Sequence, residues 1–345
     1  MKANSKLLRQ PTIPRPGWPV KLWSLLLNLA IYALLFGVLA YRQRIAFHVL
    51  RTRESSLFGS LWRLATAVIL IFLLTTAVHE LGHLLAGKLV GLRLHLLIIG
   101  PLRVVRENGR LRVSLQKSVA IFNGMTKSLP EDARNLPHRL LAYTLGGPLA
   151  SLLQAVLAAA LFVRWAADVH FTNNNAWVVE SAAITAVYAA IIFLSAIKPT
   201  RYQSELPADG GRIISLLYAS PEAARWCALV ALSGADVRGQ RPRDWDESLI
   251  QQALTGYDHT HDGQLARFLT YFWALDNGRI AEANRWLEEA IAIHPTRLAN
   301  IPIHLLWEKA YFAARHLNDP VQARGLLTHV RSKEREQPGH LRADA

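Results

Sequence analysis

A five-residue motif, HELGH, constrains this chain most, because it places His79, Glu80 and His83 inside an otherwise apolar run. If the run is helical, the two histidines lie one turn apart on one face, where their neutral imidazoles can bind one metal ion. Two histidines and a carboxylate are costly in apolar surroundings unless they face a polar cavity or a metal. The motif therefore predicts a zinc site. Histidines with a purely structural role on a buried helix are the alternative.

The apolar run around the motif is long enough to cross a membrane. It extends from about Arg63 to Val90, and about 20 apolar residues span a bilayer core of about 30 Å. Hydrophobic residues make up 51% of the chain and the mean hydropathy is +0.16, which favours a multi-pass membrane protein. The other stretches of spanning length are Leu22–Tyr41, Leu140–Trp165 and Trp177–Ile197.

The formal net charge of +14 does not indicate a nucleic-acid partner. The basic residues lie in loops beside apolar spans and are not interleaved with aromatic residues that could stack on bases. We interpret them as cytoplasmic anchors: residues 1–21, 93–134 and the segment after Lys198 are rich in Lys and Arg, whereas 166–175 has none. Four arginines in 42–53 would then lie outside, against this rule. Cys227 is the only cysteine, which excludes an intramolecular disulfide.

An alternating pattern follows the HELGH span, between Leu94 and Leu115. Apolar residues alternate with arginines on either side of Asn108-Gly109, a tight-turn signal, so we expect a β-hairpin with one apolar and one basic face. Its edge is a candidate to pair with an extended peptide near the zinc. A passive hairpin on the membrane surface is the alternative.

Two further motifs follow. GGPLAS, Gly146–Ser151, lies in the third span and predicts close packing against another helix. LPADGG, Leu206–Gly211, comes after the fourth span, which stops at Lys198-Pro199. It places Asp209 at a helix start, where the carboxylate is a candidate third, oxygen ligand. An ordinary turn with a helix N-cap is the alternative.

Together, HELGH, GGPLAS and LPADGG in this order resemble the site-2 protease family of intramembrane zinc metalloproteases, over about Leu64 to Ala219. The resemblance implies that His79, His83 and Asp209 bind Zn²⁺ and that Glu80 is the general base. It also implies a three-helix catalytic core, membrane-spanning protein substrates cut in regulated intramembrane proteolysis, and a β-element that meets unwound substrate.

The chain departs from the family pattern at two positions. Family members often carry asparagine where this chain has Ser151 and Ala196, and those asparagines are thought to help hold the substrate strand. We therefore expect substrate handling to differ more than zinc binding. The alternative function is a catalytically silent membrane scaffold of the same fold. A soluble-facing zinc protease with one anchoring span is a third choice.

The composition becomes soluble beyond Ser220. Ser220-Pro221-Glu222 predicts a helix start, and amphipathic helices follow. A pattern at Tyr271–Ala283 recurs at Tyr311–Ala323, which indicates tetratricopeptide-type repeats, with a plain helical bundle as the alternative. These helices are the candidate binding surface for a cytoplasmic protein partner. The cluster Asp258-His259-x-His261-Asp262 is a candidate second metal site whose geometry nothing in the sequence fixes.

The predicted fold is an all-α polytopic membrane protein with a small β-hairpin: a site-2 protease-like three-helix catalytic core followed by a C-terminal helical domain. We expect it in a cell membrane, as a multi-pass protein of a bacterial inner membrane, with the C-terminal domain in the cytoplasm. The predicted domains are a cytoplasmic tail (1–21), a first transmembrane span and loop (22–61), a membrane-embedded metalloprotease core (62–219) and a soluble helical domain (220–345).

Overall fold

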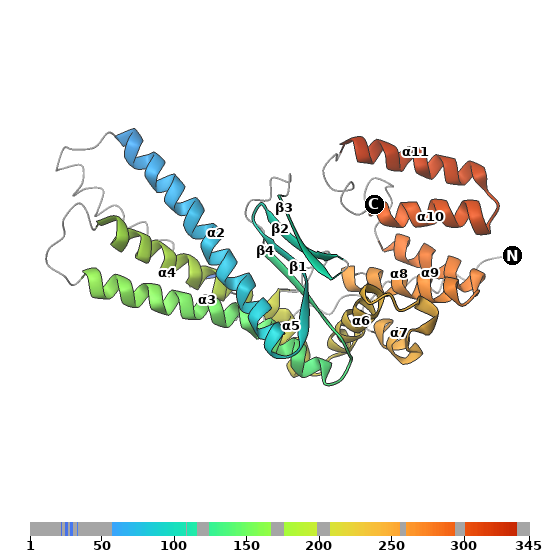
Figure 1. The fold of residues 1–345 in the computed structure, drawn as a ribbon, viewed down its shortest axis with the longest axis horizontal. Coiled ribbons are helices and arrows are strands. Elements are labelled where there is room, and N and C mark those ends of the chain that lie inside the picture. Colours follow the sequence, from blue (N-terminus) through green and yellow to red (C-terminus); the bar gives the residue numbers. More distant parts are fainter. Residues whose placement is uncertain are drawn as a thin grey trace.

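The computed structural model describes isolated positions near the N-terminus and several longer segments (Figure 1). They are Leu22, Leu25, Leu26, Asn28, Leu29 and Ala33, and residues 57–107, 109–115, 124–166, 176–198, 208–255, 260–293 and 301–336. The predicted tail 1–21 and most of the predicted first span lie outside the described residues. The arginine-rich part of the following loop and nearly all of the connection 166–175 do so as well.

Three of the described helices are long and apolar enough to cross a membrane. They are α2 (Leu57–Leu89), α3 (Leu136–Ala166) and α4 (Ala176–Ala196). Only 28%, 28% and 17% of their most apolar windows are buried within the protein, so most of this surface requires a lipid environment. The second, third and fourth predicted spans are thus confirmed as membrane-capable helices, although α2 begins at Leu57 rather than near Arg63.

Helices α2 and α3 pack with their backbones in contact. Gly82 of α2 faces Gly146 of α3, and a Cβ on either residue would overlap the carbonyl of the other. The methyl groups of Ala86 and Ala150 lie at the same crossing. Small residues allow this approach, which is typical of helix contacts in membranes. The close packing predicted for the GGPLAS segment is confirmed, and it brings α3 against the helix that carries HELGH.

An antiparallel sheet follows α2 directly. Its strands are β1 (Leu92–Ile99), β2 (Leu102–Glu107), β3 (Arg110–Leu115) and β4 (Gly124–Pro130), in the order β3-β2-β1-β4. Gly91 takes a positive φ of 77°, which lets the chain turn from α2 straight into β1. The predicted hairpin is present as β2 and β3, with Val104 opposite Val113, but it forms only half of a four-stranded sheet. No sequence pattern predicts β4.

Strand β4 runs antiparallel to β1 and contacts both α2 and α6. Its last residues, Ser128, Leu129 and Pro130, are buried. Arg238, at the end of α6, donates a hydrogen bond to the Pro130 carbonyl at 2.6 Å. Because of these contacts, β4 connects the HELGH helix to the C-terminal part of the chain.

The rest of the described chain is helical. Ser220 accepts a hydrogen bond from the Ala223 N–H, and Pro221 is the first helical residue of α6, as predicted for this helix start. A core of Leu, Ile, Ala and aromatic side chains lies between the later helices. The helices are α5 (Asp209–Leu217), α6 (Pro221–Val237), α7 (Glu247–Ala253), α8 (His261–Asp276), α9 (Ile280–Ala292), α10 (Ile303–His316) and α11 (Pro320–Glu336), with a 3₁₀ turn at Pro242–Asp244.

The predicted repeats fall on two antiparallel helix pairs, α8–α9 and α10–α11 (Figure 1). The matching aromatic residues are not equivalent in burial, since Tyr271 is fully buried whereas Tyr311 is 53% exposed. The helix pairs are therefore present, and a tetratricopeptide-type repeat remains a prediction.

The spanning helices α2, α3 and α4 extend to one end of the molecule, and helices α6–α11 lie towards the other (Figure 1). The sheet lies between these two groups, next to α2. If the three helices cross a membrane, the sheet and the C-terminal helices lie on the same side of it.

Candidate metal centre

Helix α2 carries the first three residues of the centre. His79, Glu80 and His83 are each more than nine-tenths buried, and the two imidazoles lie on the same face. His83 is six residues and His79 ten residues before Leu89, so the histidines lie about 9–15 Å from the end of the helix at a rise of 1.5 Å per residue. The centre thus lies inside the spanning segment, near the end from which the sheet emerges.

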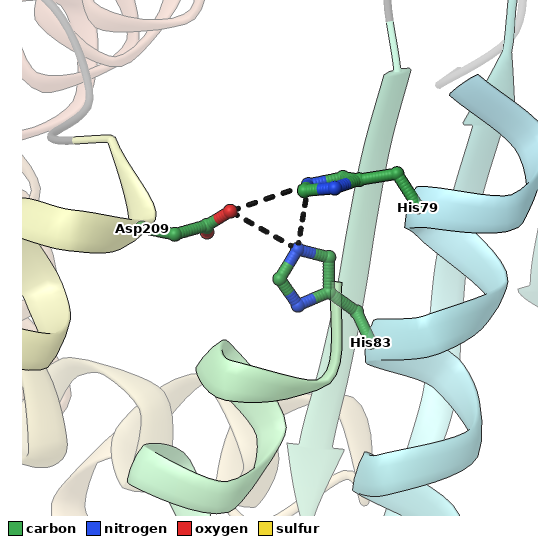
Figure 2. A group of neighbouring side chains, drawn as sticks. All are labelled: His79, His83 and Asp209. Atoms are coloured by element: carbon green, nitrogen blue, oxygen red, sulfur yellow. Dashed lines mark hydrogen bonds and ion pairs between the residues drawn. The ribbon is translucent and has the colours of Figure 1, made fainter. Parts of the chain in front are cut away.

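Asp209 completes a triangle of ligand atoms with the two histidines (Figure 2). The Nε2 atoms of His79 and His83 are 3.2 Å apart, and Oδ2 of Asp209 lies 3.2 Å and 3.3 Å from them. A tetrahedral zinc ion with bonds of about 2.0–2.1 Å has its ligands about 3.3 Å from one another. The three side chains therefore fit a zinc ion, with the fourth position left for water or substrate.

The Nδ1 atom of each imidazole also has a hydrogen-bond partner. Nδ1 of His79 is 2.9 Å from Oγ of Ser151, and Nδ1 of His83 is 2.9 Å from the backbone carbonyl of Tyr143. Partners at Nδ1 fix the ring orientation and leave Nε2 for a metal, the usual arrangement around metal-binding histidines. Gly147 lies against the His83 ring, where a Cβ would overlap Nε2.

Asp209 is the first residue of α5 rather than its N-cap, which is Ala208. The side chain is therefore not used to cap the helix, and it turns to the histidines. Gly210 packs against the carbonyls of Ile197 and Lys198 so closely that a Cβ would overlap them, which holds α5 to the end of α4. Burial acts to raise the pKa of Asp209, but the two imidazoles beside its carboxylate outweigh burial and lower the pKa to about 2. The carboxylate is thus ionised at neutral pH, as a metal ligand must be.

Glu80 lies next to the histidines and is held by the sheet. The Thr126 hydroxyl of β4 donates to Oε2 of Glu80 at 2.6 Å, and Gly124 lies so close to Oε1 that a Cβ there would overlap it. The Tyr143 hydroxyl donates in turn to the Thr126 carbonyl. Strand β4 therefore sets the position of the one carboxylate in the HELGH motif.

A cleft of about 860 Å³ opens beside these residues. Strand β4 lines it from Gly124 to Leu129, helix α2 contributes His79, Glu80 and His83, and α4 contributes its last turns. Helices α5, α6 and α8 also contribute, through Arg212, Trp226 and Asp262 among others. An extended peptide in this cleft would lie against both Glu80 and the predicted metal site.

Residues 67–198 match the model of peptidase family M50. The relationship to the site-2 protease family, predicted from the three motifs, is thereby confirmed over this segment. The matched segment contains HELGH and GGPLAS but ends before Asp209. M50 peptidases are metalloproteases, and the spatial group His79, His83 and Asp209 agrees with that class. No curated protein and no solved structure matches the chain significantly.

The two departures from the M50 pattern now have positions. Ser151 is fully buried, and its hydroxyl lies 2.9 Å from Nδ1 of His79, one of the predicted metal ligands. Ala196 lines the cleft, where an asparagine would have offered polar groups to a substrate. The two departures thus lie in different parts of the site: Ser151 contacts His79, and Ala196 lies on the wall of the cleft.

The candidate second metal site is not assembled by the part of the chain that the structure describes. Asp258 and His259 lie outside the described residues, and Asp262 forms an ion pair with Arg212 at 2.7 Å. Three contacts in and around the first site are not predicted by any sequence pattern: Thr126 to Glu80, Tyr143 to Thr126, and Arg212 to Asp262. They join elements far apart in the chain and carry no local pattern, whereas Ser151 had been marked by its place in GGPLAS.

Proposed function

We propose that this protein is an intramembrane zinc metalloprotease that hydrolyses peptide bonds of membrane-embedded protein substrates in regulated intramembrane proteolysis. The observation that carries the proposal is the placement of three ligand atoms with zinc-like spacing beside a buried glutamate, on the wall of one cleft. The M50 match supports the same class of chemistry.

Each residue of the site has a distinct role in the proposed reaction. Zinc held by His79, His83 and Asp209 would lower the pKa of a bound water toward about 7 and polarise the scissile carbonyl. Glu80 accepts a proton from the water that adds to the carbonyl carbon. As the C–N bond breaks, Glu80 passes that proton to the leaving amine. The Thr126 hydroxyl holds Oε2 of Glu80 during both transfers.

We further propose that substrate pairs with the edge of β4 rather than with the β2–β3 hairpin considered from the sequence. A peptide bond in a helix is shielded by its own hydrogen bonds, so the substrate must unwind, and an edge strand can accept the extended segment. Residues Gly124–Leu129 line the cleft beside Glu80, whereas all six residues of β3 are exposed and none lines it. Tyr143 occupies the Thr126 carbonyl and would limit how far such pairing extends.

For the location, we propose a bacterial inner membrane with the sheet and C-terminal helices in the cytoplasm. The common side of these two parts agrees with the Lys and Arg pattern, which places both in the cytoplasm. In a Cys227→Ser background, an impermeant thiol reagent added outside should label a cysteine at Asn174 and spare one at Gly109. The reverse labelling would invert the orientation.

A catalytically silent scaffold is the competing function, and substrate trapping separates the two. Full-length Glu80→Gln protein should retain zinc and accumulate intact membrane proteins that the wild type cuts, identified by affinity purification and mass spectrometry. Glu131→Gln is the control, since Glu131 is half-exposed at the end of the sheet and outside the cleft. Identical membrane-protein fragments in cells with wild-type and Glu80→Gln protein would favour the scaffold. A protein partner for the C-terminal helices remains a prediction.

A further inference from the structure

Helix α5, which begins with Asp209, is only nine residues long. A helix of this length has little stability of its own, so its orientation depends on the contacts that hold it. The close approach of Gly210 to the carbonyls at the end of α4 fixes one point near its start. Helix α5 also packs against α3 and α6, and Arg212, about one helical turn after Asp209, adds a buried charged contact to this packing.

Arg212 is 8% exposed and joins three helices. Its Nη1 lies 2.7 Å from Oδ2 of Asp262 in α8, and its guanidinium carbon lies 4.5 Å from the ring centre of Trp226 in α6. A planar guanidinium satisfies both contacts at once, by a charge-assisted hydrogen bond to the carboxylate and by stacking on the indole. The contacts tie the helix of Asp209 to the C-terminal helices.

Burial makes the ion pair sensitive to the loss of either partner. The Asp262 side chain is 13% exposed, so both charges are largely removed from water. If one partner is removed, the other remains as an uncompensated buried charge and the local structure must open to hydrate it. An opening between α5 and α8 would move Arg212, and with it the short helix that places Asp209.

The C-terminal helices also hold the second element that reaches the site. Arg238 of α6 binds the Pro130 carbonyl of β4, the strand whose Thr126 holds Glu80. Both the ligand helix α5 and the strand β4 are thus attached to the C-terminal helices, and Trp226 and Asp262 line the same cleft as Glu80.

We infer that Arg212 and Asp262 are positioning residues for the metal centre, which hold α5 so that Asp209 stays within reach of His79 and His83. The C-terminal helices then contribute to the geometry of the metal centre, in addition to any role in binding a partner. The inference rests on the proposed function, because it concerns the third ligand of the same zinc site.

The test compares two Asp→Asn variants of the full-length, zinc-loaded protein in detergent. Asp262→Asn removes the partner of Arg212, and Asp276→Asn removes the partner of Arg241, an ion pair of 2.6 Å that is more exposed and lies outside the cleft. We expect Asp262→Asn to release zinc to a chelator about 10-fold faster than wild type, at the lower end of the loss in metal affinity that follows removal of a group supporting a metal ligand. Asp276→Asn should match wild type, and Asp262→Glu should restore most of the slow release.

Two further readouts keep the outcome clear. The visible spectrum of Co²⁺-substituted protein reports ligand geometry, and it should change in Asp262→Asn but not in Asp276→Asn. If Asp262→Asn does not fold, Arg212→Lys takes its place, because it keeps the charge but loses the planar group over Trp226. Zinc release and Co²⁺ spectra unchanged from wild type in folded Asp262→Asn, or in Arg212→Lys where that variant is used, would overturn the inference.

Amide hydrogen exchange separates this inference from the proposed function. Loss of the ion pair should speed exchange in α5 of Asp262→Asn, whether or not zinc is bound. If the wild type binds no zinc but α5 exchanges faster in the variant, the proposed function fails and the attachment of α5 stands. If the wild type binds zinc and neither zinc release nor α5 exchange responds to the variant, the function stands and the inference fails.

Discussion

The two outer strands of the sheet differ in every contact that bears on the reaction. Strand β4 buries its last three residues, binds Glu80 through Thr126 and lines the cleft. Strand β3 has six exposed residues and lies on the far side of β2 and β1 from β4. Both are edge strands, yet of the two only β4 packs against α2, the helix that carries His79, Glu80 and His83.

The difference shows that an alternating sequence pattern locates a strand but not its neighbours. The pattern around Asn108-Gly109 predicts β2 and β3 well because their two faces differ in polarity. It does not indicate that β4 returns on the other side of β1, next to Glu80. The edge near the centre is thus set by the order of the strands in the sheet.

The largest effect is expected at Glu80, the group that β4 holds. Glu80→Gln should lower peptide cleavage by about 10²–10⁴-fold, the usual contribution of a general acid–base group, because the amide cannot accept the proton. Zinc content, measured by atomic absorption, should equal that of the wild type. A cleavage rate within a few-fold of wild type would show that Glu80 is not the general base. The contact of β4 with Glu80 would then no longer set β4 apart from β3.

Matched proline substitutions compare the strands directly. Met125→Pro on β4 should lower cleavage by about 10²-fold, since it breaks the pairing with β1 and shifts the strand that positions Glu80. Val113→Pro on β3 should change cleavage by less than about twofold, because no residue of β3 lines the cleft. Both residues are exposed and lie on edge strands, where proline is tolerated, so both variants should fold and hold zinc. Equal losses in the two variants would contradict the assignment of β4.

A subtler change tests the hydrogen bond alone. Thr126→Val keeps the shape of the side chain but removes the donor to Glu80, and a bond to a charged group contributes about 2 kcal/mol. We expect kcat to fall by about 30-fold with little change in KM, measured on a labelled membrane peptide. Ser114→Val on β3 is the matched control and should behave as wild type. If Thr126→Val instead raises KM and leaves kcat unchanged, the Thr126 hydroxyl contributes to substrate binding rather than to the position of Glu80.

The smallest effect is expected behind His79. Ser151→Ala removes the partner of Nδ1 and should weaken zinc affinity by about tenfold, measured by competition with a chelator. Ser195→Ala, which alters the cleft wall on α4, should leave zinc affinity unchanged. Equal affinities for Ser151→Ala and wild type would show that the Ser151 contact does not support the ligand.

The sequence predicted those parts of the site that depend on local spacing or on motif order. His79 and His83 share a helix face because of their four-residue spacing. Asp209 was predicted as a third ligand from its place in the LPADGG motif, because its distance from the histidines cannot be read from the sequence. Thr126 lies 46 residues from Glu80, on a strand that begins with glycine and ends with proline and shows no clear alternation of apolar and polar residues. The Arg212–Asp262 pair was missed for the same reason, and Asp262 had been considered as a metal ligand.

The zinc content of the full-length protein purified in detergent tests the central claim most directly. The geometry of His79, His83 and Asp209 predicts about one zinc per chain in the wild type, as for a three-ligand catalytic site, and nearly none in the His79→Ala, Asp209→Ala double variant. A wild-type protein that takes up no zinc, or a double variant that keeps the full amount, would contradict the account.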